Sequence, residues 1–81
     1  MPKIMTANNI RPEELLNTLR QGKATTIHFI GVAKGESIFI DKKSGKICLA
    51  KHHEISCLTT DDEVSEHIKR LLKEYNRIVL I

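Results

Sequence analysis

The spacing of apolar residues near the C-terminus predicts a helix followed by a strand. Between residues 60 and 75 the apolar side chains recur at intervals that place them on one helix face, and they are Val64, Ile68, Leu71, Leu72 and Tyr75. Thr60 and Glu63 have the spacing of a capping box, which marks a helix start. The last four residues, 78–81, are all large and apolar, which predicts an inner strand of a sheet.

A shorter helix is predicted between Pro12 and Gly22. Proline is favoured at the first helical position, because its missing N–H would have no partner there. Glu13 and Glu14 then lie in the first turn, where the helix dipole favours negative charge. The leucines of this stretch share one face, and they are Leu15, Leu16 and Leu19. Gly22 can take the left-handed conformation that commonly ends a helix.

Four stretches between the two helices are rich in β-branched and other apolar residues, and each predicts a strand. They cover residues 25–30, 37–40, 47–50 and 55–58. The predicted order is therefore α-β-β-β-β-α-β, within one domain that spans residues 1–81. Residues 1–9 are expected to be a loose lead-in, unless residues 3–5 add a short strand.

This order is typical of an α+β domain. Consecutive hairpins flanked by helices favour a small antiparallel or mixed sheet of four to five strands. Both helices are expected on one face of the sheet, with the C-terminal strand in a central position.

Length and composition limit the functions that the domain can have. A chain of 81 residues buries only about 60–65% of the surface that it exposes when unfolded, which leaves little room for a deep pocket. Phe29, Phe39 and Tyr75 are the only Phe, Tyr or Trp residues, so binding of single-stranded nucleic acid by base stacking is disfavoured. The net charge of +3 permits an acidic partner without requiring one.

The expected location is the cytoplasm. No apolar run approaches the roughly 18 residues of a membrane-spanning helix. The first residues lack the apolar region of a signal peptide. In a cytosolic protein the two cysteines are expected to be reduced.

Cys48, His52, His53 and Cys57 form the most site-like cluster in the sequence. Thiolates and imidazoles are the ligands that zinc prefers, and four of them can close a tetrahedral site. The spacing does not match a standard zinc motif, however, and adjacent histidines tend to point apart. We therefore favour buried structural cysteines and turn histidines, and we expect no metal or other cofactor.

Two other chemistries are open to the same cysteines. A histidine can activate Cys48 or Cys57 as a nucleophile, with Asp61 or Asp62 to orient the base. No catalytic signature surrounds either cysteine, so no enzymatic activity is expected. A disulfide between the two is geometrically feasible, but a reducing compartment disfavours it.

Basic residues gather at two places. The predicted hairpin tip carries Lys42, Lys43 and Lys46, and the long helix carries Lys69, Arg70 and Lys73. Such groups can follow nucleic-acid phosphates, although lysines on loops and helix exteriors are also common on proteins with no such role. His28 and His67 stand apart from these groups, and we assign them no function.

Three functions follow from these observations. The first is a small non-enzymatic intracellular binding module or regulator, which acts through a protein partner or by self-association. An open sheet of this size favours it, because its edges can pair with another strand. The first alternative is nucleic-acid binding by the basic hairpin tip and helix face. The second is a metal-binding or thiol module at the cysteine and histidine cluster.

Overall fold

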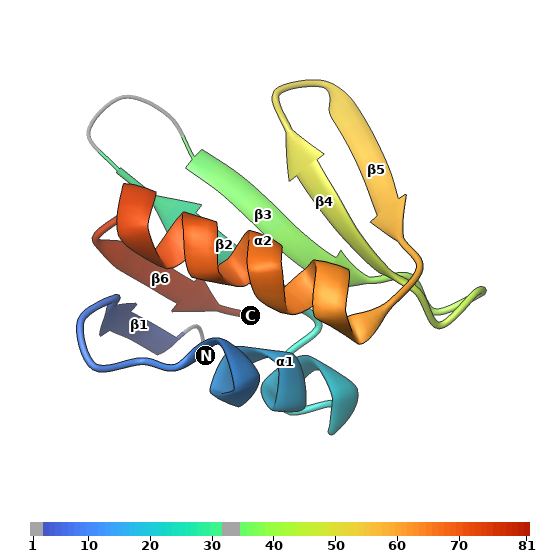
Figure 1. Ribbon diagram of the computed structural model, residues 1–81, viewed down its shortest axis with the longest axis horizontal. Coiled ribbons are helices and arrows are strands. Elements are labelled where there is room, and N and C mark those ends of the chain that lie inside the picture. Colours follow the sequence, from blue (N-terminus) through green and yellow to red (C-terminus); the bar gives the residue numbers. More distant parts are fainter. Residues whose placement is uncertain (1–2, 32–34) are drawn as a thin grey trace.

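The computed structural model describes residues 3–31 and 35–81, which form two helices and a six-stranded antiparallel sheet (Figure 1). The elements are β1 (Lys3–Thr6), α1 (Pro12–Arg20), β2 (Thr26–Ile30), β3 (Gly35–Ile40), β4 (Ile47–Lys51), β5 (Glu54–Leu58), α2 (Asp61–Glu74) and β6 (Arg77–Leu80). Across the sheet the strands are ordered β1-β6-β2-β3-β4-β5. The predicted α+β class with two helices is therefore confirmed.

The prediction of four to five strands is wrong by one strand, because residues 3–6 form the edge strand β1. Lys3 lies opposite Leu80 and Thr6 lies opposite Arg77, so β1 pairs with β6 along its whole length. A loose lead-in is therefore incorrect for these residues, while residues 1 and 2 lie outside the described part. The strand is hard to recognise in the sequence because its side chains are mostly exposed. Its position depends on the free backbone edge of β6.

The C-terminal strand β6 is an inner strand, as predicted, with β1 on one side and β2 on the other. The expected central position is wrong, because β6 is second in the strand order and β1 is added outside it. Its side chains are not buried to the same degree. Ile78 is fully buried, Val79 and Leu80 are half-buried, and Ile81 is 55% exposed just beyond the strand. Successive residues of a strand point to opposite faces, so only every second one can reach the core under the helices.

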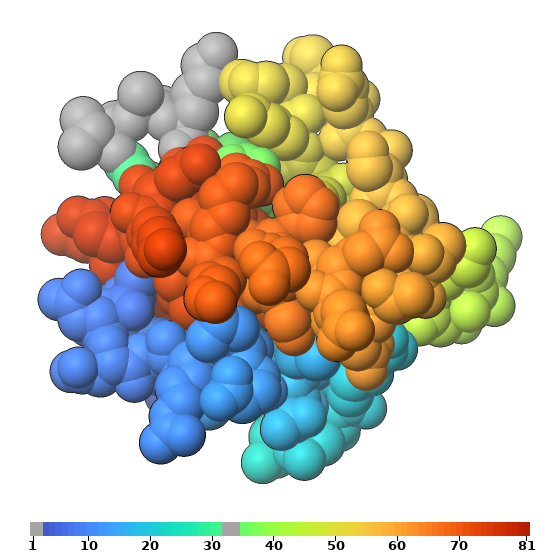
Figure 2. Space-filling view, in the orientation of Figure 1, coloured from blue at the N-terminus to red at the C-terminus, as the bar shows by residue number. Residues whose placement is uncertain are grey.

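The core lies between the helices and one face of the sheet. The buried residues of the helices pack against those of the strands, and they are Leu15, Leu16, Leu19, Val64, Ile68 and Leu71 from the helices and Ile27, Phe29, Ile38, Ile47 and Ile78 from the strands. The two helices also contact each other. In the space-filling view they form a continuous cover, blue to cyan for α1 and orange for α2 (Figure 2).

The helix ends follow the sequence signals. The Thr60 hydroxyl accepts a hydrogen bond from the Glu63 backbone N–H at 3.2 Å, which confirms Thr60 as the N-cap of α2. After α1, Gly22 has a positive φ of 74°. The Gly22 and Lys23 backbone N–H groups donate to carbonyls of the last helical turn, so the predicted glycine stop is a Schellman-type ending.

Replacing the buried side chain of β6 is expected to destabilise the fold strongly. Ile78→Ala removes a fully buried side chain and should lower the free energy of unfolding by about 2–4 kcal/mol. Lys69→Ala is the control, because truncation of an exposed side chain on α2 should cost less than about 0.5 kcal/mol. Urea unfolding curves measure both values. Equal losses for the two variants would contradict the burial pattern of β6.

Candidate functional site

The face of the sheet that points away from the helices is the main surface that the fold leaves uncovered. On this side a row of directly paired residues crosses all six strands, and it consists of Ile4, Val79, His28, Ser37, Ala50 and Ile55. Directly opposed residues of neighbouring strands point to the same face. Their neighbours along each strand, such as Phe29 and Ile78, belong to the core under the helices. We call the helix-free side the open face.

The open face carries exposed apolar side chains. Ile4 is 72% exposed, Ile55 66% and Ile30 42%. Ile81 also belongs here, because its backbone N–H and carbonyl continue the ladder to Thr26. Single exposed apolar residues are common on proteins. Among the described residues, however, every large apolar side chain that is strongly exposed lies on this one face.

Charge is nearly absent from the open face. Among the described strand residues that point to it, Arg77 is the one charged side chain. The remaining positions are apolar, small or neutral polar residues, and they include Thr26, Phe39 and Ala50. In an antiparallel sheet with one solvated face, the residues along each strand usually alternate, with hydrophobic side chains on the core face and polar side chains on the solvated face. This face departs from that pattern along its whole width.

His28 and Ser37 lie side by side on β2 and β3, the two central strands of the sheet. The His28 Nδ1 and Ser37 Oγ atoms are 2.6 Å apart, within hydrogen-bonding distance, and both side chains are half-buried. The sequence assigned His28 no function. In the structure this pair provides a polar centre within an otherwise largely apolar row.

Cys48 and Cys57 form a disulfide, so the expectation of two reduced thiols is wrong for this structure. The two cysteines lie directly opposite each other on β4 and β5, with their Cα atoms 3.9 Å apart. Cys48 is buried, whereas Cys57 is exposed on the open face. Disulfides persist mainly in oxidising environments, so the bond gives no support to the expected cytoplasmic location.

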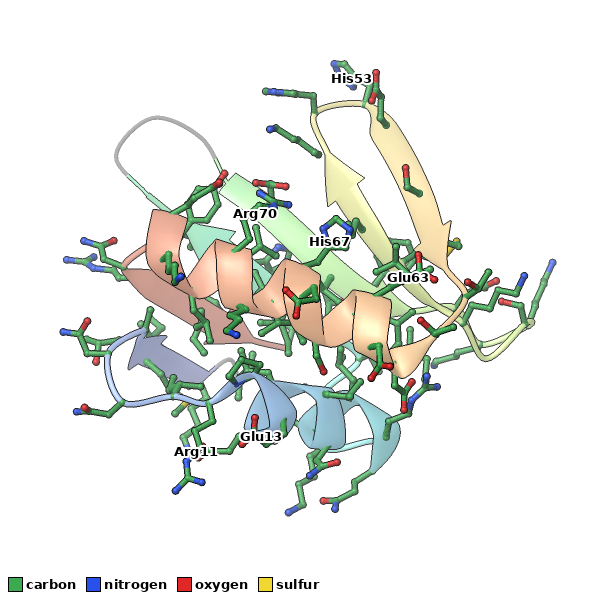
Figure 3. The ribbon with its side chains drawn as sticks, viewed as in Figure 1. Arg11, Glu13, His53, Glu63, His67 and Arg70 are labelled. Atoms are coloured by element: carbon green, nitrogen blue, oxygen red, sulfur yellow. A yellow bond between two sulfur atoms is a disulfide. The ribbon has the colours of Figure 1, made fainter. Side chains whose placement is uncertain are left out.

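The proposed metal cluster does not assemble in the structure. Both cysteine sulfurs are bonded to each other, while His52 and His53 occupy the turn between β4 and β5. His53 points outward at the end of this hairpin (Figure 3). Within residues 3–31 and 35–81, no three His, Cys, Asp or Glu side chains are placed to hold a metal ion together. The disulfide also leaves neither sulfur free to act as a nucleophile with Asp61 or Asp62.

The basic residues do not form one continuous patch. Lys42, Lys43 and Lys46 are exposed at the turn between β3 and β4. The Arg20 guanidinium ties this turn to the start of α2, because it donates to the Gly45 carbonyl and to the Asp61 carboxylate. The acidic first turn of α2 therefore lies beside the hairpin tip. Lys69 lies eight residues after Asp61, about 12 Å further along α2. The acidic first turn of α2 therefore separates the two basic groups.

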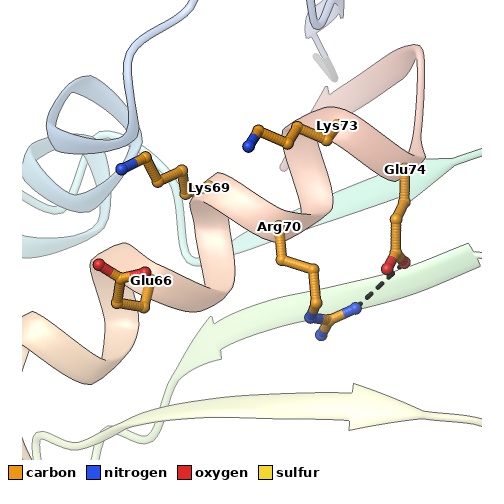
Figure 4. Close-up of a pocket in the computed structure, with 5 residues that line it drawn as sticks. All are labelled: Glu66, Lys69, Arg70, Lys73 and Glu74. Atoms are coloured by element: carbon orange, nitrogen blue, oxygen red, sulfur yellow. Dashed lines mark hydrogen bonds and ion pairs between the residues drawn. The ribbon is translucent and has the colours of Figure 1, made fainter.

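The second basic group is itself mixed in charge. Glu66, Lys69, Arg70, Lys73 and Glu74 line an open hollow of about 320 Å³ on α2 (Figure 4). The Arg70 guanidinium donates to the Glu74 carboxylate at 3.1 Å across this hollow. Paired acids and bases on an exposed helix are a common solvated surface. The hollow gives no geometric sign of a selective anion site.

Glu36 is a buried carboxylate that sequence reasoning missed. Its side chain is 3% exposed, and it lies on the helix-covered side of β3. Arg70, on α2 (Figure 3), donates to both of its carboxylate oxygens at 3.3 Å. The Tyr75 hydroxyl donates a further hydrogen bond at 2.9 Å. The alternation of Glu36, Ile38 and Ile40 was the available signal, because it places Glu36 on the core face.

Burial alone would raise the pKa of Glu36, but hydrogen bonds from Arg70 and Tyr75 outweigh it, and the pKa lies below its ordinary value of 4.5. The hydrogen bond to Glu36 is the main reason why the pKa of Arg70 is raised. Burial, followed by the hydrogen bond to Glu36, raises the pKa of Tyr75. The cluster thus holds an ionised carboxylate under the C-terminal half of α2. Both carboxylate oxygens of Glu36 accept hydrogen bonds from residues of the fold, so we interpret the cluster as structural.

His67 lies on α2 above the strands (Figure 3), and its half-buried ring has a buried Nδ1 without a hydrogen-bond partner among the described residues. No described helix combines the length and the apolar character needed to span a membrane.

Comparison with protein-family models, with curated proteins and with solved structures finds no match to this chain.

Removing Arg70 is expected to destabilise the protein in a pH-dependent way. Arg70→Met leaves Glu36 buried without its cation and should lower the free energy of unfolding by about 2–3 kcal/mol at pH 7. The contribution of the pair is fully present above pH 4.5 and is lost as the pH falls through the lower folded-state pKa of Glu36. The difference between the two proteins should therefore narrow at pH 3.5.

Urea unfolding at pH 7 and pH 3.5 measures this difference. Lys69→Met is the matched control, because Lys69 is exposed on the outer side of the same helix and makes no resolved ion pair among the described residues. An equal loss for Arg70→Met at both pH values would exclude Glu36 as the cause.

Opening the disulfide is expected to cost stability without abolishing the rest of the core. The bond closes a loop between residues nine apart in sequence, which corresponds to about 2–3 kcal/mol in the chain-entropy model. Adding dithiothreitol to the natural chain should therefore shift its urea midpoint downward. The variant Cys48→Ala with Cys57→Ala should have the lower midpoint from the start. A reductant effect on that variant would show that the shift has another origin.

Proposed function

We propose that this protein is a small non-enzymatic binding module that acts by protein–protein contact through the open face of its sheet. The observation that carries this function is the gathering of Ile4, Ile30, Ile55 and Ile81 on one nearly uncharged face. Exposed apolar side chains gathered on one face of a small protein are a common mark of an interaction site. Depletion of charge is also characteristic of the centre of protein interfaces.

The edges of the sheet add to this surface. β5 pairs with β4 alone, and four of its five residues are exposed. Glu54, at the first position of β5, is its one charged residue, so the edge has little of the charge that usually blocks strand pairing. The open face and the β5 edge meet at Ile55. A partner that covers the face therefore also shields this edge.

The clusters outside the open face favour binding over catalysis. Glu36, the one buried carboxylate among residues 3–31 and 35–81, has its hydrogen-bond partners within the fold. The hollow on α2 is small and open, and its arginine is held by Glu36 and Glu74. A catalytic group needs a reacting partner within hydrogen-bond reach and some shelter from water. Neither cluster offers such a place.

Photo-crosslinking in the cells that naturally make the protein tests this function. A benzophenone side chain introduced at position 4 or 55 should give a crosslinked product of discrete mass, because both positions lie on the open face. Exposed positions 17 and 21, on and just after α1, are matched controls on the covered side and should give none. Equal labelling at all four positions, or none at 4 and 55, would contradict a binding role for the open face.

A further inference from the structure

We propose, on the basis of this binding function, that the occupant of the open face is a second copy of the same chain. The two sheets would pack face to face about a two-fold axis that runs parallel to the strands between β2 and β3. The dimer would then have four layers, with helices outside and two sheets inside. Closed two-fold dimers are the commonest form of oligomer among proteins.

The open face extends over all six strands of the sheet. The strands have four to six residues each and neighbouring strands lie about 4.8 Å apart, so the face is about 25 Å wide and about 15–20 Å long. Two such faces in contact bury a surface at the lower end of the range of specific interfaces. Two sheets packed in this way lie about 10 Å apart, which a single layer of interdigitating side chains from each face fills.

The distribution of charge favours an identical partner. The chain has a net charge of +3, so two copies repel each other unless their charges stay apart. Burying an unpaired charge is also costly. Among the described strand residues of the open face only Arg77 is charged, and it lies outside the central row, opposite Ile30 at the end of β2. Face-to-face packing therefore leaves nearly all charges in solvent.

The central row is self-complementary under the proposed axis. Rotation about that axis reverses the strand order, so β1 faces β5, β6 faces β4 and β2 faces β3 of the second copy. In the row this brings Ile4 opposite Ile55 of the second copy. Val79 then faces Ala50, a large residue against a small one. His28 faces Ser37, so the polar pair at the centre meets another polar pair.

The arrangement explains why Ile4 and Ile55 are the most exposed isoleucines although they lie at opposite ends of the row. Within one chain, β1 and β5 are the two outermost strands and cannot cover each other. In the dimer each isoleucine covers the other, twice over. Burying such a side chain contributes roughly 1.5–3 kcal/mol. Both edge strands therefore contribute to the stability of the dimer.

A charge-swap experiment tests both the partner and the axis. Sedimentation equilibrium of the natural chain should give twice its mass of 9.2 kDa. Ile4→Glu and Ile55→Lys should each weaken dimerisation by at least about 100-fold, because each buries an unpaired charge. An equimolar mixture of the two variants should recover the dimer, since the carboxylate of one chain then faces the ammonium of the other. Asn17→Glu and Gln21→Lys make the same charge changes on the helix side and should leave the dimer intact.

Circular dichroism and melting temperature of each variant should show that the monomer still folds, because both positions are exposed in the single chain. A natural chain that stays monomeric at millimolar concentration would overturn the second copy as partner. Crosslinks from positions 4 and 55 to a different protein would then keep the binding function itself. If the Ile4→Glu and Ile55→Lys variants remain dimeric, the chain self-associates through another surface, such as the β5 edge, and the proposed interface is wrong. Monomeric variants that fail to pair when mixed would overturn the proposed axis.

Discussion

The structure is governed by one constraint: a six-stranded sheet has two faces, and the two helices cover only one of them. α1 has 9 residues and α2 has 14, and together they cover one face of six strands. No third helix occurs among the described residues to cover the other face. The buried side chains of Ile27, Phe29 and Ile38 lie on the covered side, and the isoleucines of the uncovered side meet solvent. A chain with this architecture therefore presents apolar sheet surface unless something binds there.

The sequence predicted the elements that carry strong local signals. Thr60 and Glu63 marked the start of α2, and Gly22 marked the end of α1, because capping depends on a few adjacent residues. The inner position of β6 followed from its uninterrupted apolar residues. For β1 the sequence left a short strand and a loose lead-in both open, since its side chains are mostly exposed and its backbone partner lies more than seventy residues away in sequence.

The candidate site was harder to predict, because it depends on register. Pairing of β4 with β5 places Cys48 opposite Cys57, and a shift of one residue would have separated their side chains onto different faces. The same holds for Glu36, whose burial beside Arg70 joins residues 34 apart in sequence. The isoleucines of the open face looked like ordinary strand residues. Only the strand order shows that Ile4 and Ile55 end the same row.

The position of β6 between β1 and β2 means that the order of folding cannot follow the order of synthesis. A growing chain makes β1 first, yet its only sheet neighbour is made after every other described element. β2, β3, β4 and β5 are antiparallel neighbours in sequence, so they can pair through short loops as they emerge. β1 must meanwhile stay unpaired, and its apolar side chains are open to other chains. Nascent copies are therefore most exposed to aggregation just before residues 77–80 leave the ribosome.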